Sequence, residues 1–83
     1  MAQIVLNRAN FIREMTAGKF DEYIIYVEGK EHYIVARCAD GTELVLGTIG
    51  YDRRTWSNII PPADFLRECG VLSFHVQYLK ASS

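Results

Sequence analysis

The chain has 83 residues, which is enough for one domain with a thin core, because a domain of this size buries only about 60% of its unfolded surface. Hydrophobic residues make up 49% of the chain and charged residues 23%, so the composition is that of a globular domain and excludes a disordered chain. The formal net charge is −1, which excludes both a generally basic surface for nucleic acid and an acidic mimic of DNA.

The sequence carries no sign of a membrane or secretory destination. No apolar run approaches the roughly 20 residues of a membrane span, and the N-terminus lacks the basic region and apolar stretch of a signal peptide. We therefore expect a cytoplasmic protein. Cys38 and Cys69 form neither a CxxC pair nor a metal-binding spacing. Buried thiols are expected for both, with a disulfide or a reactive thiol as the alternatives.

The N-terminal part predicts a short apolar segment followed by a helix. Residues 3–6 are an edge strand or a lead-in, and Asn7 is placed to cap a helix. Residues 8–17 predict that helix, since apolar side chains at helical spacing share one face. Gly18 is placed to end it in a left-handed conformation. The apolar face consists of Phe11, Ile12 and Met15.

Three segments in the middle of the chain predict an antiparallel meander. Residues 22–28, 32–38 and 43–47 are rich in β-branched, aromatic and aliphatic side chains. Gly29–Lys30 joins the first two, and the Asp40–Gly41 pair before the third is a strong hairpin signal. Short connections of this kind make consecutive strands antiparallel.

The first two of these strands are apolar on both faces. Tyr23 and Ile25 point to one face, while Ile24 and Tyr26 point to the other. A sheet with two apolar faces must be covered on both. Helices are expected on one face, and the loop, a terminal segment or another subunit on the other.

A second helix is expected after two consecutive prolines. A residue that precedes proline is disfavoured in the α region, so Ile60 and Pro61 are expected to be extended, with Pro62 as the first helical residue. Gly70 is placed to end this helix. Its buried stripe is expected to consist of Phe65, Leu66 and Cys69.

Residues 71–79 predict the last strand, since apolar and polar side chains alternate along it. Its buried side is expected to consist of Leu72, Phe74, Val76 and Tyr78. Residues 80–83 are expected to be a flexible tail. The element order is therefore (β)-α-β-β-β-α-β within a single domain, residues 1–83. The predicted fold is α+β in two layers, a mostly antiparallel sheet of four to five strands with two helices packed on one face.

No sequence pattern points to catalysis or to a metal. The chain has no HExxH, GxSxG or P-loop motif. His32 and His75 are expected to be solvated or locally hydrogen-bonded. We expect a protein that is not an enzyme, with no cofactor, no bound metal and no small-molecule substrate.

The segment 47–56 is the strongest candidate for partner binding. It contains adjacent arginines and the single tryptophan of the chain, and these residue types dominate protein interfaces. The same side chains can contact phosphates and stack on bases. In the structural alternative, Trp56 plugs the small core and Asp52 pairs with one arginine. The candidate site residues are Tyr51, Arg53, Arg54 and Trp56, of which Trp56 is expected to be an anchor and the others exposed. Further candidates for a basic patch are Lys19, Lys30, Arg37 and Lys80.

A set of residues in the second half of the chain forms a recognisable pattern. It lies within residues 44–76 and consists of Leu46-Gly47-Thr48, the two arginines, Trp56, and Phe65-Leu66-Arg67-Glu68-Cys69-Gly70-Val71 with Phe74. The pattern resembles the small partition-associated proteins that are encoded beside partition genes on proteobacterial plasmids and integrative elements. The resemblance implies an accessory protein of a mobile genetic element, and it transfers no catalytic residue.

The leading functional hypothesis is a non-enzymatic protein-interaction module. It would bind a protein partner, with a second copy of the chain as one candidate, through the second face of the meander and the loop 51–56. The first alternative is a nucleic-acid-binding accessory factor that uses the same loop. The second alternative is a phage or plasmid inhibitor of a host defence system.

Overall fold

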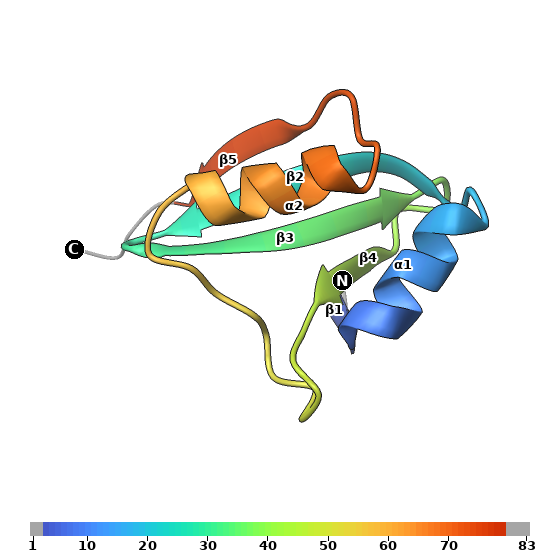
Figure 1. Ribbon diagram of the computed structural model, residues 1–83, viewed down its shortest axis with the longest axis horizontal. Coiled ribbons are helices and arrows are strands. Elements are labelled where there is room, and N and C mark those ends of the chain that lie inside the picture. Colours follow the sequence, from blue (N-terminus) through green and yellow to red (C-terminus); the bar gives the residue numbers. More distant parts are fainter. Residues whose placement is uncertain (1–2, 80–83) are drawn as a thin grey trace.

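The computed structural model describes residues 3–79 and shows an α+β fold with one five-stranded sheet (Figure 1). Its elements are β1 (Gln3–Leu6), α1 (Arg8–Thr16), β2 (Phe20–Glu28), β3 (Glu31–Cys38), β4 (Glu43–Leu46), α2 (Ile60–Glu68) and β5 (His75–Leu79). The strand order across the sheet is β1-β4-β3-β2-β5. Both helices pack on the same face, so the predicted α+β class is confirmed, and the predicted element order is consistent with the structure. The tail predicted at 80–83 lies outside the described residues.

The sheet is mixed, and its predicted antiparallel character is confirmed only for the three central strands. β3 pairs antiparallel with both β2 and β4. The two outer strands instead run parallel to their neighbours, β1 to β4 and β5 to β2. Tight turns force consecutive strands to be antiparallel. Neither outer strand is joined to its neighbour by such a turn, because helices and other strands intervene along the chain.

The first helix begins at Arg8 as predicted and ends at Thr16, one residue before the predicted end. The Asn7 side chain accepts a hydrogen bond from the Asn10 backbone N–H at 2.9 Å, which satisfies one of the free donors of the first turn. Gly18 adopts a positive φ of 74° directly after the helix, a conformation that costs other residues more than glycine. β2 then begins at Phe20, two residues before the predicted start, with an irregular register between Phe20 and Glu22.

The second helix begins at Ile60, so the prediction that Ile60 and Pro61 are extended is wrong. The Asn58 carboxamide oxygen accepts a hydrogen bond from the Ile60 N–H at 3.0 Å and stabilises this start. Both prolines then lie in the first turn, where the backbone N–H groups have no partner within the helix and their loss costs little. Gly70 follows the helix with a φ of 90°, as predicted.

The last strand is shorter and more exposed than predicted. β5 begins at His75, and the four residues before it form no strand. Leu72 is 100% exposed, Val76 is 42% exposed and Tyr78 is 74% exposed, so the expectation that these three are buried is wrong. The fourth, Phe74, is partly buried and packs against the core beneath the helices. Helix α2 lies over β2 and β3 (Figure 1), and its Leu66 packs in one cluster with Ile25 of β2 and Ile34 of β3.

The core has one part on each face of the sheet. The part beneath the helices consists of Phe11, Ile25, Ile34, Ala36, Leu46 and Leu66. The part on the other face consists of Tyr33, Val35 and Val45, with Val5, Tyr26 and Leu79 around it. No helix covers this second part, yet Val35 is 0% exposed. Long side chains of the strands themselves and Arg53 from the loop lie over it. We call it the polar-covered face.

Two further expectations concern the thiols and the membrane. Cys38 and Cys69 are free and half-buried. Burial is the main effect that raises the pKa of each thiol, so both are protonated near neutral pH. Within residues 3–79, no helix has the length and apolar character needed to cross a membrane.

Candidate functional site

The connection between β4 and α2 runs back along β3 (Figure 1). Arg53 lies opposite Gly47 in an isolated antiparallel bridge, and Trp56 lies opposite His32 in a second one. The Trp56 N–H donates to the His32 carbonyl at 2.9 Å, and the His32 N–H donates to the Trp56 carbonyl at 2.8 Å. The Trp56 side chain packs against the core beneath the helices. Trp56 therefore anchors this long connection, as the sequence predicts.

The two adjacent arginines point to opposite faces of the sheet. Successive side chains on an extended backbone alternate in direction. Arg53 reaches the polar-covered face, where its guanidinium carbon lies 4.0 Å from the centroid of the Tyr33 ring. Its Nη2 is also 3.3 Å from a carboxylate oxygen of Glu31 and 3.5 Å from one of Glu28. Arg53 is thus held by an aromatic ring and two carboxylates.

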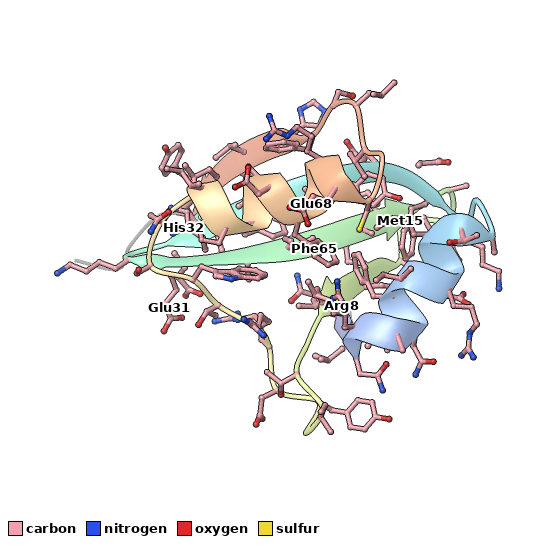
Figure 2. All side chains as sticks on the ribbon, in the orientation of Figure 1. Arg8, Met15, Glu31, His32, Phe65 and Glu68 are labelled. Atoms are coloured by element: carbon pink, nitrogen blue, oxygen red, sulfur yellow. The ribbon has the colours of Figure 1, made fainter. Side chains whose placement is uncertain are left out.

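Arg54 points to the helix side and lines a small groove there. Its guanidinium carbon lies 5.3 Å from the centroid of the Trp56 ring. The groove has a volume of about 250 Å³. Its walls include Arg8, Leu46, Arg54, Trp56, Pro61 and Phe65, and its rim on α2 carries Asp64 and Glu68. We call it the Arg8–Arg54 groove. Figure 2 shows Arg8 from α1 and Phe65 and Glu68 from α2 on its two sides.

The two guanidiniums of this groove form no ion pair with any acidic side chain that the structure describes. The Arg8 guanidinium carbon lies 5.6 Å from the centroid of the Phe65 ring. Among residues 3–79, none of the ion pairs involves Arg8 or Arg54. A guanidinium that stacks on a ring keeps its N–H groups free at its edge. The groove therefore offers two cations with free hydrogen-bond donors above two aromatic faces.

The other candidates from the sequence lie elsewhere. Tyr51 is 58% exposed at the tip of the connection with a positive φ of 63°, and it does not line the groove. Lys19 pairs with Glu14 at 3.1 Å, and Arg37 belongs to the polar-covered face. Of the four predicted site residues, the structure brings together only Arg54 and Trp56. Lys80 lies outside the described residues.

Sequence reasoning missed the other half of the groove. Phe65 was expected only as part of a buried stripe, and Arg8 lies outside the apolar face of its helix. The local pattern carries no signal that brings these two side chains together. They meet because α1 and α2 lie on the same face of the sheet, with Arg8 at the start of α1 close to Phe65 of α2.

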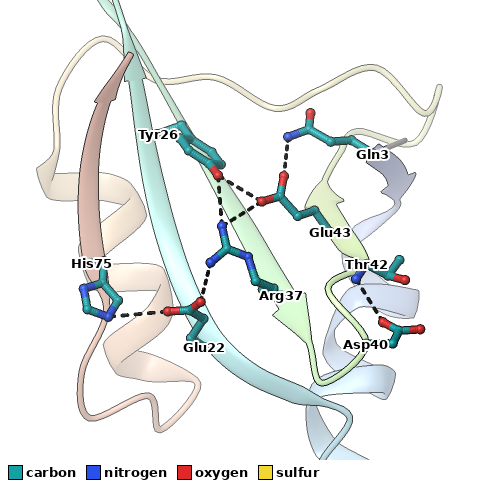
Figure 3. A network of polar contacts seen from close by, with 8 residues as sticks. All are labelled: Gln3, Glu22, Tyr26, Arg37, Asp40, Thr42, Glu43 and His75. Atoms are coloured by element: carbon teal, nitrogen blue, oxygen red, sulfur yellow. Dashed lines mark hydrogen bonds and ion pairs between the residues drawn. The ribbon is translucent and has the colours of Figure 1, made fainter. Parts of the chain in front are cut away.

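The polar-covered face carries a closed network of charges (Figure 3). The Arg37 guanidinium donates to Glu43 at 2.9 Å and to Glu22 at 2.5 Å. The Tyr26 hydroxyl donates to Glu43 at 3.0 Å, and the Gln3 amide donates to Glu43 at 2.7 Å. Within the described part of the chain, no buried side-chain nitrogen or oxygen lacks a hydrogen-bond partner. This network joins the strands, and its charged groups are paired with one another.

The network shifts the ionisation of its members. Burial alone would raise the pKa of Glu43, but hydrogen bonds from Gln3, Arg37 and Tyr26 outweigh burial and lower that pKa. Burial raises the pKa of Tyr26, and the hydrogen bond to Glu43 raises it further. The carboxylate is therefore held ionised, and the phenol is held protonated, at neutral pH.

A second hollow, of about 740 Å³, is bordered by α1, the start of β2 and the connection from α2 to β5. Met15, at the α1 side of this hollow, is labelled in Figure 2. Of its two carboxylates, Glu22 pairs with Arg37 and lies 3.5 Å from the imidazole of His75, and Asp21 adds a second negative charge. Its thiol, Cys69, has a raised pKa. This hollow offers a ligand no unpaired cation, and the Arg8–Arg54 groove remains the better candidate.

Neither histidine belongs to a metal-binding cluster within residues 3–79. His32 Nδ1 lies 3.3 Å from the Trp56 carbonyl oxygen, and His75 lies beside Glu22. No group of three histidine, cysteine or acidic side chains in that range is arranged to hold a metal ion.

No protein-family model matches the chain, and no curated protein matches it.

Proposed function

We propose that the protein is a non-enzymatic interaction module that holds an acidic and apolar segment of a partner protein in the Arg8–Arg54 groove. The observation that carries the proposal is the pair of guanidiniums, each above an aromatic ring and neither paired with a carboxylate of residues 3–79. A carboxylate is the side-chain group whose geometry matches the guanidinium edge.

The groove also fits the apolar half of such a segment. Trp56 and Phe65 offer ring faces, and Leu46 and Pro61 add aliphatic surface. Interfaces draw most of their binding energy from a few tryptophan, tyrosine and arginine side chains. A volume of about 250 Å³ accommodates a few side chains rather than a whole domain face. The acidic rim on α2 repels a second carboxylate there, so it orients the segment with its acidic side toward the arginines.

Nucleic acid is the less favoured ligand. Binding to a polynucleotide depends on several phosphate contacts made by lysine and arginine. The groove has two cations and an acidic rim, and the third nearby cation, Arg53, is held on the opposite face by Glu28 and Glu31. The net charge of −1 adds no attraction. A mobile-element accessory protein or an inhibitor of a host defence protein would use the same protein-binding groove, and these roles differ only in the partner.

Trp56 provides a direct signal of binding, because it is the only tryptophan of the chain and lines the groove. The probes are two blocked octapeptides, one of alternating glutamate and leucine and one with glutamine in place of each glutamate. We expect the acidic peptide to change the Trp56 fluorescence in a saturable way. We also expect it to bind at least about tenfold more tightly than the glutamine peptide, because loss of one charged hydrogen bond lowers affinity by about that factor.

A matched pair of variants assigns the binding to the groove. Arg54→Gln is expected to weaken the acidic peptide by about tenfold. Arg13→Gln removes an exposed arginine of α1 that does not line the groove, and it is expected to leave the affinity unchanged. Equal affinity for both peptides, or equal effects of the two variants, would overturn the proposal. Binding of an oligothymidylate that exceeds binding of the acidic peptide would replace it with the nucleic-acid function.

A further inference from the structure

Along the described strand itself, His75–Leu79, the β5 edge of the sheet carries none of the side chains that usually protect an edge strand. Within the described residues, β5 pairs only with β2, so its outer backbone groups face no other strand. Proteins commonly protect such an edge with lysine or other charges, with proline or with a bulge. The segment His75–Leu79 contains no lysine, arginine, aspartate, glutamate or proline. Its edge is therefore free to pair with another strand.

Apolar surface is concentrated along the same part of the chain. The described residues include seven exposed large hydrophobic side chains, and three of them, Leu72, Val76 and Tyr78, lie between residues 72 and 78. Val76 and Tyr78 alternate with Gln77 and so point to the same face of the sheet. They are level with Ile25 and Val27 of β2, on the helix side. An exposed edge bordered by apolar side chains is typical of a strand-pairing interface.

We propose that a second copy of this chain pairs with β5 in antiparallel fashion about a twofold axis at Gln77. This axis places Val76 opposite the partner subunit's Tyr78, and by symmetry Tyr78 opposite the partner subunit's Val76. Aromatic and β-branched side chains form favourable cross-strand pairs. Gln77 faces the partner subunit's Gln77, so the pairing brings together no like charges. The two sheets then form one continuous sheet with all helices on one side.

The second copy is favoured over other occupants because the strand is complementary to itself. A twofold interface requires the same surface on both subunits, and the residues on either side of Gln77 meet this requirement. The opposite edge, β1, is shorter, with four residues, and is followed directly by Asn7 and α1. The interface is small, so a weak dimer that forms with rising concentration is expected.

Introducing a positive or a negative charge at Gln77, on the proposed twofold axis, tests the dimer. Gln77 is exposed, so Gln77→Lys and Gln77→Glu are expected to fold normally. In sedimentation equilibrium from micromolar to millimolar concentration, the unmodified chain should dimerise. Each variant alone should dimerise roughly fivefold more weakly, because like charges meet at the axis. An equimolar mixture of the two variants should regain the affinity of the unmodified chain.

Two controls locate the effect. Gln3, on β1 at the other edge, donates a hydrogen bond to Glu43, and a lysine there keeps a donor for that carboxylate. Gln3→Lys is therefore expected to fold normally and to leave the dimer unchanged. Arg54→Gln, which tests the groove, is also expected to leave it unchanged, so failure of one proposal is distinguishable from failure of the other. A chain that stays monomeric over the whole range, a mixture no tighter than its components, or an equal effect at Gln3 would overturn the dimer.

Discussion

Adjacent arginines with the same chemistry have different surroundings in this protein. Arg53 lies 4.0 Å above the ring of Tyr33, which is 3% exposed, and is held by two carboxylates. Arg54 lies above Trp56 with no acidic partner in the described part of the chain. A residue's environment, and not its type, therefore separates a stabilising arginine from one that is available to a ligand.

We expect ionisation of Glu43 to contribute to stability, because three side chains donate hydrogen bonds to this carboxylate. Its pKa is lowered in the folded protein from an ordinary value of 4.5. A lowered folded pKa contributes stability above the unfolded pKa, and this contribution is lost as the pH falls through the folded pKa. We therefore expect stability to decrease below a pH of about 4.5. Glu43→Gln should cost about 1 kcal/mol at pH 7 and flatten this decrease.

Urea unfolding from pH 7 to pH 3 measures the Glu43 effect. Glu68→Gln is the matched control, because Glu68 is exposed and makes no ion pair within residues 3–79. An acid response that is the same in Glu43→Gln as in the unmodified chain would show that the network contributes nothing to it.

At the scale of elements, the capping and turn patterns in the sequence predict correctly the elements that depend on contacts between residues close together in the chain. The Asn7 cap, the Gly18 end and the two tight turns define α1 and the strands β2 to β4, and all were predicted. The start of α2 was missed because the rule for residues before proline does not include the Asn58 hydrogen bond to Ile60. The length and burial of β5 were missed because alternation does not reveal whether anything covers a strand.

The connection from β4 to α2 depends on a close approach at Gly47. A Cβ atom there would collide with the side chain of Val5 and would lie 2.9 Å from the carbonyl oxygen of Asp52. Gly47→Ala is expected to destabilise the fold by about 1–3 kcal/mol, because the neighbours must move. Gly50→Ala has only ordinary contacts, the nearest at 3.7 Å, and is expected to stay within about 0.5 kcal/mol of the unmodified chain.

Denaturant unfolding of both glycine variants measures the difference. Equal stabilities for Gly47→Ala and Gly50→Ala would mean that the approach of the connection to β1 is looser than described.

At the scale of the whole molecule, the two faces of the sheet are covered by different kinds of structure. Helices cover one face, and polar side chains of the strands cover the other. The sequence showed that both faces are apolar, but it did not show that arginine, tyrosine and glutamate side chains cover the second. The groove was equally beyond a local prediction, since it joins Arg8 of α1, Phe65 of α2 and Arg54 of the connection.

The same substitution at two leucines tests this arrangement. Leu66 is 0% exposed beneath α2, whereas Leu72 is 100% exposed in the segment first predicted as a strand. Leu66→Ala is expected to cost about 2–5 kcal/mol of unfolding free energy, because it leaves a cavity in the core. Leu72→Ala is expected to change stability by less than about 0.5 kcal/mol. A large loss at Leu72 in a thermal or denaturant melt would contradict the exposure described.

The most direct test of the central claim compares Arg53→Gln with Arg54→Gln in two measurements on each variant, the free energy of unfolding in denaturant and the affinity for the acidic octapeptide. Arg53→Gln should lower stability by about 0.5–1 kcal/mol, through loss of the contact with Tyr33, and leave peptide affinity unchanged. Arg54→Gln should weaken the peptide about tenfold and change stability less. The claim is contradicted if the two variants behave alike, or if Arg53→Gln is the one that loses the peptide.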